Sequence, residues 1–282
     1  MPVEIGAELR ESFELVDIAS RPDGVIVTPA VTVDSAFLEA AGPQLRVVAN
    51  YAVGVDNLDL DAIRAREVVA TNTPGVLTNA TAEHTIALML ALLRRVGEGD
   101  RSLRRRDRWE WGPDFMVGES LESKEVLVVG PGRIGRRVAE LAEAHGARAT
   151  FAGRDDDLVA ALAKADVVTL HCPLTPQTRH LVDARALSAM KPTAVLVNTA
   201  RGQVVDEPAL VGALERGAIA GAALDVFEHE PAVSEELLAL ENVVLTPHIA
   251  SATRDTRLAM GRLVVDALRA VLLEGRTPPN AV

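Results

Sequence analysis

Arg201, Glu230 and His248 are the residues of this 282-residue chain whose types and placement could do chemistry together. Each follows a short apolar run typical of a β-strand. Arginine can hold a carboxylate through two hydrogen bonds and polarise the carbonyl beside it. Histidine can deliver a proton near neutral pH, and a carboxylate paired with it favours the charged ring and fixes its orientation. The set suits hydride transfer to a keto acid. Taken singly, the arginine could equally be a surface ion pair, the histidine a structural loop residue, and Glu230, like Glu228, a loop charge.

A glycine-rich turn joins a strand-like run at 125–129 to a helical pattern at 136–145, and its sequence is Gly130-Pro131-Gly132-Arg133-Ile134-Gly135. Gly130 permits a tight turn, Gly132 lets the backbone approach a pyrophosphate, and Gly135 lets helix pack on strand. The helix N-terminus then offers N–H groups and a positive dipole end to the phosphates. We interpret the six residues as a dinucleotide-binding turn, against the alternative of an ordinary glycine-rich turn.

Strand-like runs alternate with helical patterns along the chain. The early strands are predicted at 13–18, 24–27, 45–50 and 68–71, with helices at 33–41 and 58–64. Later strands are predicted at 126–129, 149–152, 166–171, 194–198, 220–226 and 243–246. A helix at 206–216 is capped by Asp206 and ends before Gly217. This alternation predicts parallel sheets with helices on both faces.

Two longer helices, predicted at 80–96 and 254–273, look like connectors between domains. Because the glycine turn lies mid-chain, we expect its domain to be inserted into another one. The predicted fold class is α/β: a Rossmann-type doubly wound parallel sheet inserted into a smaller flavodoxin-like α/β domain. The expected boundaries are 1–77 with 251–282 for the substrate domain and 78–250 for the dinucleotide-binding domain. The cleft between two such domains is the default ligand site.

Composition excludes several other classes. The formal net charge of −11 argues against general affinity for nucleic acid or for an anionic membrane. An arginine run is interpreted as a solvated or subunit-facing helix surface, and its members are Arg94, Arg95, Arg101, Arg104, Arg105, Arg106 and Arg108. A single cysteine, Cys172, excludes an intrachain disulfide and fits a reducing compartment. With neither a signal pattern nor a membrane-spanning apolar run, we expect a cytoplasmic protein. We also expect no metal site.

Taken together, these motifs resemble the D-isomer-specific 2-hydroxyacid dehydrogenase family over nearly the whole chain. The resemblance includes Asn-Tyr-Ala-Val-Gly-Val-Asp-Asn at 50–57, Asn-Thr-Pro-Gly-Val-Leu-Thr at 72–78, the glycine turn and the three segments above. It implies that Arg201 binds and polarises the substrate, that His248 is the acid/base, and that Glu230 pairs with it. It also implies that the backbone at Val53 and Gly54 holds the substrate carboxylate. The implied cofactor contacts, beyond the glycine turn, are Thr81, Cys172, Pro173, Thr199, Ala200 and Asp225, the last near the nicotinamide carboxamide.

Within the family, the chain is most similar to glyoxylate/hydroxypyruvate reductases, in stretches at 48–57, 72–82, 240–253 and 275–282. Family members dimerise through an arm that follows the helix equivalent to 80–96, so we expect a homodimer. Phosphorylated substrates need extra cations, and the 27–32 loop has neither arginine nor lysine. A small acid such as glyoxylate or hydroxypyruvate is therefore favoured over 3-phosphoglycerate.

Cofactor choice depends on the position after the second strand of the nucleotide domain. NAD-binding turns place an Asp or Glu there to bond the ribose 2′-OH. By resemblance this position is Gly153, and Arg154 follows it. Without the acid, repulsion toward a 2′-phosphate is lost and Arg154 can pair with it, so we predict NADPH preference. NADH stays possible, since Asp155 can shift into place and 155–157 carry three acidic residues.

The chain departs from the family pattern twice. Little precedes 13–18, where the family has a strand and a helix, so either a strand is missing and a sheet edge is exposed, or the true start lies upstream. After Arg154 a helix and a short strand are absent, which can open the adenosine pocket. Two alternatives also stand beside the reductase hypothesis: an NAD-dependent dehydrogenase of D-lactate or 3-phosphoglycerate, and a non-catalytic NAD(P)H-sensing binding protein. The intact arginine, glutamate and histidine weigh against the second.

Overall fold

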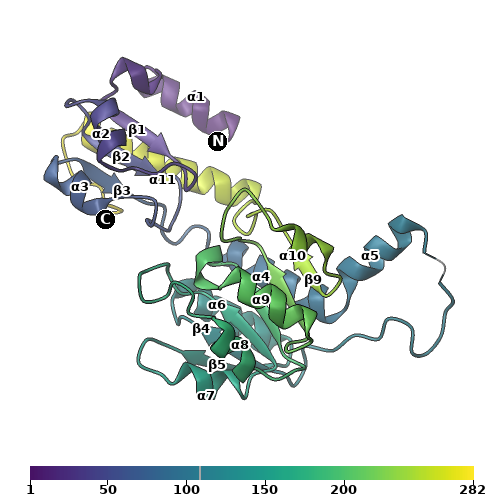
Figure 1. Ribbon diagram of the computed structural model, residues 1–282. Helices are drawn as coiled ribbons and strands as arrows, with labels where there is room; N and C mark the ends of the chain where they lie inside the picture. The colour runs from purple at the N-terminus through teal and green to yellow at the C-terminus, as the bar shows by residue number, and fades with distance from the viewer. Residues whose placement is uncertain (108) are drawn as a thin grey trace. The chain divides into compact units, whose positions relative to one another are not determined.

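The computed structural model describes residues 1–107 and 109–282, so Arg108 of the arginine run lies outside the described residues (Figure 1). The chain forms two compact units. The first combines Met1–Leu77 with Ser251–Val282, and the second is Thr78–Ala250. Within the described part of the chain, no helix is both long and apolar enough to cross a bilayer.

The second unit is built around a six-stranded parallel sheet with strand order β5-β4-β6-β7-β8-β9. Its strands are β4 Glu125–Val129, β5 Arg148–Ala152, β6 Val167–Leu170, β7 Val195–Asn198, β8 Gly221–Leu224 and β9 Val243–Leu245. Its helices are α4 Thr78–Leu93, α5 Val96–Arg105, α6 Arg133–Ala144, α7 Leu158–Leu162, α8 Ala184–Ala189, α9 Glu207–Glu215 and α10 Glu235–Ala239, with a 3₁₀ turn at Gly202–Val204.

Helices cover both faces of this sheet, which is why its central strands β6, β7 and β8 are buried along their whole length and are mostly apolar. Alternate strand residues such as Val126 and Val128 pack with α4 and α6. The residues between them, such as Leu127, pack with α8 and α9 on the opposite face. The predicted α/β class with a doubly wound parallel sheet is therefore confirmed.

The first unit has its own parallel sheet, β1 Gly24–Val27, β2 Val47–Asn50 and β3 Val69–Thr71, in that order. One long helix, α11 Arg254–Leu272, packs against this sheet and against α1 Val3–Ser12. Two short helices, α2 Ser35–Ala41 and α3 Leu60–Ala65, contribute to the core. They begin two residues later than predicted because Asp34 and Asp59 cap them through their side chains.

The strand predicted at 13–18 is wrong. The helix α1 ends at Ser12, and the Phe13 N–H still bonds to the Leu9 carbonyl. The following residues do not pair with any described strand, and Leu15 and Val16 are exposed. Asp17 then caps a 3₁₀ turn at Ile18–Ser20. The apolar run has the composition of a strand, but none of the described strands lies beside it to bond with its backbone N–H and C=O groups.

The helix predicted at 80–96 is present as α4, but it ends at Leu93, three residues earlier than predicted. The chain leaves the helical path at Arg95, whose φ is +56°, and resumes as α5. The break is held by the returning segment, since the Glu119 N–H donates to the Leu93 carbonyl at 2.8 Å. Arg95 also pairs with Glu98 within the first turn of α5. Arg101, Arg104 and Arg105 of the arginine run therefore lie on a separate helix that has no buried residue.

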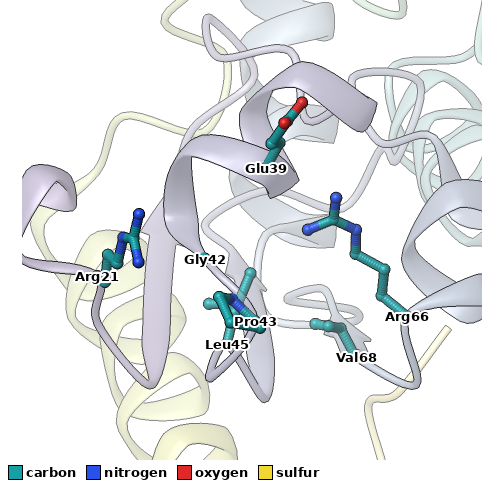
Figure 2. A pocket seen from close by; sticks show the side chains of 7 residues that line it. All are labelled: Arg21, Glu39, Gly42, Pro43, Leu45, Arg66 and Val68. Atoms are coloured by element: carbon teal, nitrogen blue, oxygen red, sulfur yellow. The ribbon is translucent and has the colours of Figure 1, made fainter.

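A pocket of about 500 Å³ lies in the first unit (Figure 2). Arg21, Glu39 and Arg66 line it together with residues just before β2 and β3. It thus lies at the amino ends of the strands. Ligands of open α/β sheets bind at the carboxyl ends, so this pocket is not the candidate active site.

The contact between α1 and α11 can be tested at Gly261. A Cβ there would collide with the buried Ile5 side chain, whose Cδ1 would be 2.8 Å away. Gly261→Ala should therefore lower the urea midpoint of unfolding, because overpacking of roughly 1–3 kcal/mol exceeds the helix-propensity gain of about 1 kcal/mol. The matched control is Gly6→Ala on α1, where the Cβ would meet only the flexible end of Arg10. Equal stabilisation by both substitutions would contradict the close packing.

Candidate active site

The predicted functional segments all begin at one edge of the six-stranded sheet. In the parallel register, the last paired residues form a single row: Ala152, Val129, Leu170, Asn198, Leu224 and Leu245. The glycine turn, Gly153 with Arg154, and the segments carrying Cys172, Arg201, Glu230 and His248 follow directly. The register therefore brings together segments that are more than a hundred residues apart in the chain.

The glycine turn has the geometry expected of a dinucleotide-binding turn. Gly130 has φ +97°, and a Cβ there would lie 2.6 Å from the Cys172 nitrogen. A Cβ on Gly135 would collide with the Gly130 carbonyl oxygen. Around Gly132, by contrast, the described residues leave open space. The first and third glycines are therefore needed for close backbone packing, and the second leaves room for a ligand.

The start of α6 can accept a phosphate. Its N-cap is Gly132, and no side chain of the described residues caps it. The first intrahelical bond runs from the Arg136 N–H to the Gly132 carbonyl, so the N–H groups of Arg133, Ile134 and Gly135 precede the hydrogen-bonded ladder. Together with the open space at Gly132, this arrangement fits the pyrophosphate of a dinucleotide.

Cys172 lies beside the glycine turn, with its nitrogen 2.6 Å from the position of a Cβ on Gly130, and Pro173 follows it in the chain. The Cys172 side chain is buried, and burial raises the pKa of its thiol. The Pro173 carbonyl accepts a hydrogen bond from Thr178 at 2.6 Å, which shapes the loop after β6. A neutral, buried thiol packs and does not react, so Cys172 contributes shape to this site.

His171 also lies beneath the turn, and sequence reasoning missed it because it was counted only as a strand residue. A Cβ on Gly130 would lie 2.8 Å from the His171 carbonyl oxygen. The His171 ring is bonded to the Thr169 hydroxyl at 2.8 Å. Burial lowers the pKa of His171 from 6.5 to about 3, so the ring is neutral at physiological pH.

His248 and Glu230 form a direct pair. Nδ1 of His248 lies 2.7 Å from Oε2 of Glu230. The second carboxylate oxygen accepts the Phe227 N–H at 3.0 Å. Burial alone raises the pKa of Glu230, but the hydrogen bonds from His248 and Phe227 and the charges of His248 and Arg201 together lower it. The carboxylate is therefore held ionised and directs the other ring nitrogen, Nε2, away from itself.

Arg201 lies on the neighbouring loop. The buried Asn198 side chain holds this loop, accepting from the Ala200 N–H at 3.0 Å and donating to the Arg201 carbonyl at 2.9 Å. A Cβ on the next residue, Gly202, would collide with the Phe227 backbone. The loops that carry Arg201 and Glu230 are thus in backbone contact, which places the predicted catalytic residues in one neighbourhood.

Thr199 and Thr81 are joined through a third hydroxyl. Thr85 lies 2.9 Å from the Thr199 hydroxyl and donates to the Thr81 carbonyl at 2.8 Å. All three residues are buried. The bonds tie the first turns of α4 to the end of β7.

Asp225 is fully buried, and its carboxylate is engaged by the protein itself. It accepts from the Thr246 hydroxyl at 2.6 Å and from the Ile249 and Ala250 N–H groups, both at 2.8 Å. Burial raises its pKa, but the nearby His84 and the hydrogen bonds from these three donors bring the pKa below the ordinary value of 3.8. His84 was not singled out from the sequence.

The predicted substrate contacts Val53 and Gly54 lie in the first unit. Their carbonyl oxygens accept from the side-chain amides of Asn72 at 2.9 Å and of Asn50 at 2.8 Å. The two bonds hold the loop after β2 in one conformation. Arg154 lies in the second unit, exposed, directly after β5 and Gly153.

His171 is half-buried, and the lowered pKa of its ring should make the fold acid-sensitive. As pH falls from about 6.5 toward 3, the unfolded chain binds a proton at this residue and the folded chain does not, so stability decreases, by up to about 1.4 kcal/mol per pH unit. His171→Gln keeps a nitrogen that can reach Thr169 but removes the titration. Urea midpoints at pH 7, 6, 5 and 4 should therefore fall less steeply for the variant. Equal dependence of the urea midpoint on pH in the wild type and the variant would show that the His171 imidazole does not contribute to the acid sensitivity.

Comparison with known proteins places this geometry in one family. Residues 86–250 match the NAD-binding domain of the D-isomer-specific 2-hydroxyacid dehydrogenases. A glyoxylate reductase from Pyrococcus furiosus is 43% identical, with 99% of this chain and 88% of the relative covered. One from Aeropyrum pernix is 44% identical, with 95% and 85% covered.

Solved structures agree. A Thermus thermophilus protein has a TM-score of 0.92 at 43% identity, covering 100% of this chain and 97% of its own. An NADPH-dependent glyoxylate/hydroxypyruvate reductase from Sinorhizobium meliloti, solved with NADP and malonate, has a TM-score of 0.87 at 36% identity, covering 100% and 94%. This chain is therefore an oxidoreductase and belongs to the D-isomer-specific 2-hydroxyacid dehydrogenase family.

Proposed function

We propose that this protein reduces a small 2-keto acid, glyoxylate or hydroxypyruvate, to the corresponding D-2-hydroxy acid. The observation that carries the proposal is the 2.7 Å pair between His248 and Glu230, beside the loop of Arg201 and at the sheet edge that also holds the glycine turn. The bound nicotinamide cofactor supplies the hydride. The residues of the chain supply substrate binding, polarisation and the proton.

Each residue has a distinct role in this proposal. Arg201 holds the substrate and draws electron density from its keto oxygen. His248 donates a proton to that oxygen as the hydride reaches the carbon, and the neutral ring then regains a proton from solvent. Glu230 stabilises the charged ring and directs Nε2 toward the substrate. We assign the N–H groups of Val53 and Gly54 to the substrate carboxylate.

Two features support a small substrate. The loop at 27–32 contains neither arginine nor lysine, so it offers no cation for a substrate phosphate. The relatives from Pyrococcus furiosus and Aeropyrum pernix are glyoxylate reductases. We therefore rank glyoxylate and hydroxypyruvate above pyruvate and 3-phosphohydroxypyruvate.

The proposal predicts turnover that depends on His248. Purified protein should oxidise NAD(P)H with glyoxylate or hydroxypyruvate, and His248→Gln should lower kcat by about 10²–10⁴-fold, because a general acid contributes roughly that much. His145→Gln, an exposed histidine at the end of α6, is the matched control and should keep wild-type activity.

Other outcomes would favour the alternatives. Cofactor binding without oxidation by any keto acid would support a sensing protein. Faster turnover of pyruvate or 3-phosphohydroxypyruvate would indicate a dehydrogenase of D-lactate or 3-phosphoglycerate. Wild-type activity in His248→Gln would reject the assigned acid.

We also propose that NADPH is preferred over NADH. Gly153 itself carries no carboxylate to bond a ribose 2′-OH or repel a 2′-phosphate, and the exposed Arg154 follows it. The acidic residues behind them are partly used within the loop. The Asp156 carboxylate accepts the Gly153 N–H at 2.7 Å, and Asp157 caps α7 through the Ala160 N–H at 3.1 Å.

The expected signature is a ratio of kcat/KM with NADPH to kcat/KM with NADH above one. Arg154→Ala should lower the ratio by about 10–100-fold, because hydrogen bonds to a charged group contribute roughly 1.5–3 kcal/mol. The matched control is Arg148→Ala, since Arg148 begins the same strand, pairs with Glu125 and lies at the opposite end of β5. NADH preference in the wild type would reject the proposal.

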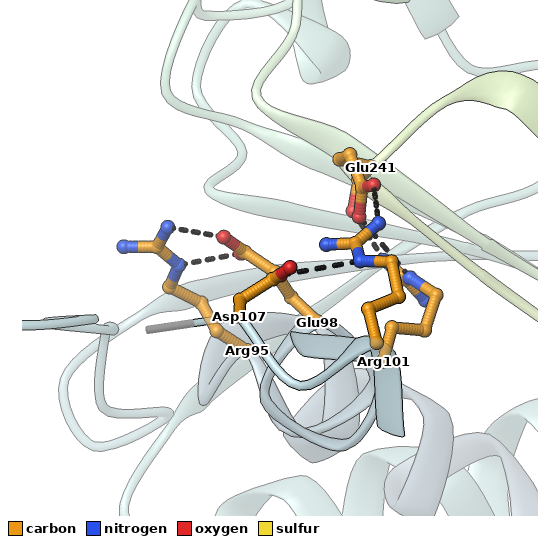
Figure 3. Close-up of polar contacts among 6 residues, drawn as sticks. Arg95, Glu98, Arg101, Asp107 and Glu241 are labelled. Atoms are coloured by element: carbon orange, nitrogen blue, oxygen red, sulfur yellow. Dashed lines mark hydrogen bonds and ion pairs between the residues drawn. The ribbon is translucent and has the colours of Figure 1, made fainter. Parts of the chain in front are cut away.

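We further propose a cytoplasmic homodimer that associates through α5 and the segment after it. Large apolar side chains are exposed there: Leu103, Trp109, Trp111, Phe115 and Val117. Exposed apolar groups gathered on one segment are typical of an interface. Arg101 bonds to Glu241 of the same unit (Figure 3), and Arg105 of α5 also bonds to the Glu241 carboxylate. These hydrogen bonds fix α5 to its own unit and leave the apolar side chains exposed for a second copy of the chain.

A further inference from the structure

The backbone at His248 adopts a left-handed conformation that contacts with other residues must stabilise. Its φ is +52°, a left-handed value that is unfavourable for a non-glycine residue unless its surroundings hold it. Asp225 holds it. The His248 N–H donates to the Asp225 carbonyl at 2.8 Å, and the next two N–H groups, of Ile249 and Ala250, donate to the Asp225 carboxylate. Three successive amides of the loop therefore converge on one residue.

This carboxylate is fully buried, and a buried charge is costly unless hydrogen bonds satisfy it. Two side chains also contact this carboxylate. The Thr246 hydroxyl donates to Oδ1 at 2.6 Å, and Nε2 of His84 lies 3.4 Å from the same oxygen. His84 belongs to α4, which is far from the loop in the sequence but packs beneath β9 and β8.

The geometry also assigns the proton on His84. Nε2 lies 3.1 Å from the Thr246 hydroxyl oxygen. A hydroxyl has one proton to donate, and Thr246 gives it to Asp225. The remaining contact can form only if Nε2 of His84 carries a hydrogen and donates to Thr246. The chain of donors thus runs in one direction, from His84 to Thr246 to Asp225.

We propose that His84 is a positioning residue for the acid/base His248. Its Nε2–H orients the Thr246 hydroxyl, and the two together keep the Asp225 carboxylate aimed at the Ile249 and Ala250 amides. These hydrogen bonds hold the left-handed turn, in which the His248 ring bonds to Glu230. The catalytic consequence rests on the proposed function, whereas the structural consequence does not.

The test separates a hydrogen-bond donor from a space-filling side chain. His84→Leu removes the donor and His84→Gln retains an N–H at similar reach. Thr246→Val keeps the shape of threonine and removes the hydroxyl, so it interrupts the same chain at a second point if His84→Leu does not fold. The exposed His145→Gln serves as the histidine control. Amide hydrogen exchange at 246–250, kcat with glyoxylate and the Kd of the cofactor are measured for each variant.

We expect His84→Leu and Thr246→Val to speed exchange at Ile249 and Ala250 at least tenfold and to lower kcat by about 10–100-fold, with cofactor Kd changed less than threefold. His84→Gln should recover most of both losses, and His145→Gln should match the wild type. In the His84→Leu/Thr246→Val double variant the losses should not add, since both break one chain.

Wild-type exchange and kcat in His84→Leu would overturn the inference. So would a His84→Gln variant as impaired as His84→Leu, because the ring would then act by its shape. A wild type that turns over no keto acid would contradict the proposed function instead, and the exchange rates would still decide whether His84 holds the loop.

Discussion

Parallel pairing of six strands in one register is the constraint on which the rest of this protein depends. Parallel strands present all their carboxyl ends at the same edge, and here the last paired residues form a single row from Ala152 to Leu245. Every segment that leaves the row enters the same small region. The largely apolar strands pack with helices on both faces, and most of the predicted site residues lie in the loops just past the carboxyl ends of the strands.

Close backbone approaches then bring these loops together. The Gly130 turn lies against the backbone of His171 and Cys172, and the loop of Gly202 lies against that of Phe227. At each contact a side chain on the glycine would collide with backbone atoms, which can give way far less than a flexible side chain. The first contact shapes the phosphate-binding turn, and the second brings Arg201 beside the loop of Glu230.

Buried polar groups fix the finer geometry. Asn198, Thr85 and Asp225 are buried, and each bonds to backbone or hydroxyl groups of a loop that carries a predicted site residue. A buried polar group without partners is costly, so these bonds hold the loops in a single arrangement. Rigid support of this kind suits a site whose proposed chemistry depends on one histidine nitrogen facing the substrate.

Much of this could be predicted from the chain, because the signals were local. The sequence predicted most of the strands, the glycine turn, the Asp206 cap and the Gly217 end of α9, because each depends on neighbouring residues. The failures were at places where distant contacts decide. The run at 13–18 has the apolar residues of a strand, but none of the described strands pairs with it. The helix predicted at 80–96 ends early, at Leu93, whose carbonyl accepts a hydrogen bond from the N–H of the distant Glu119.

The sequence by itself determined the α/β class, the dinucleotide-type turn and the residue types at the site, since these follow from periodicity, glycine placement and motif spacing. Only the tertiary structure decided which atoms join His248 to Glu230, at 2.7 Å, that His171 lies neutral beneath the turn, and that His84 reaches Thr246. The reason is physical. Those contacts join residues that are far apart in the chain, and their distances are set by sheet register and helix packing.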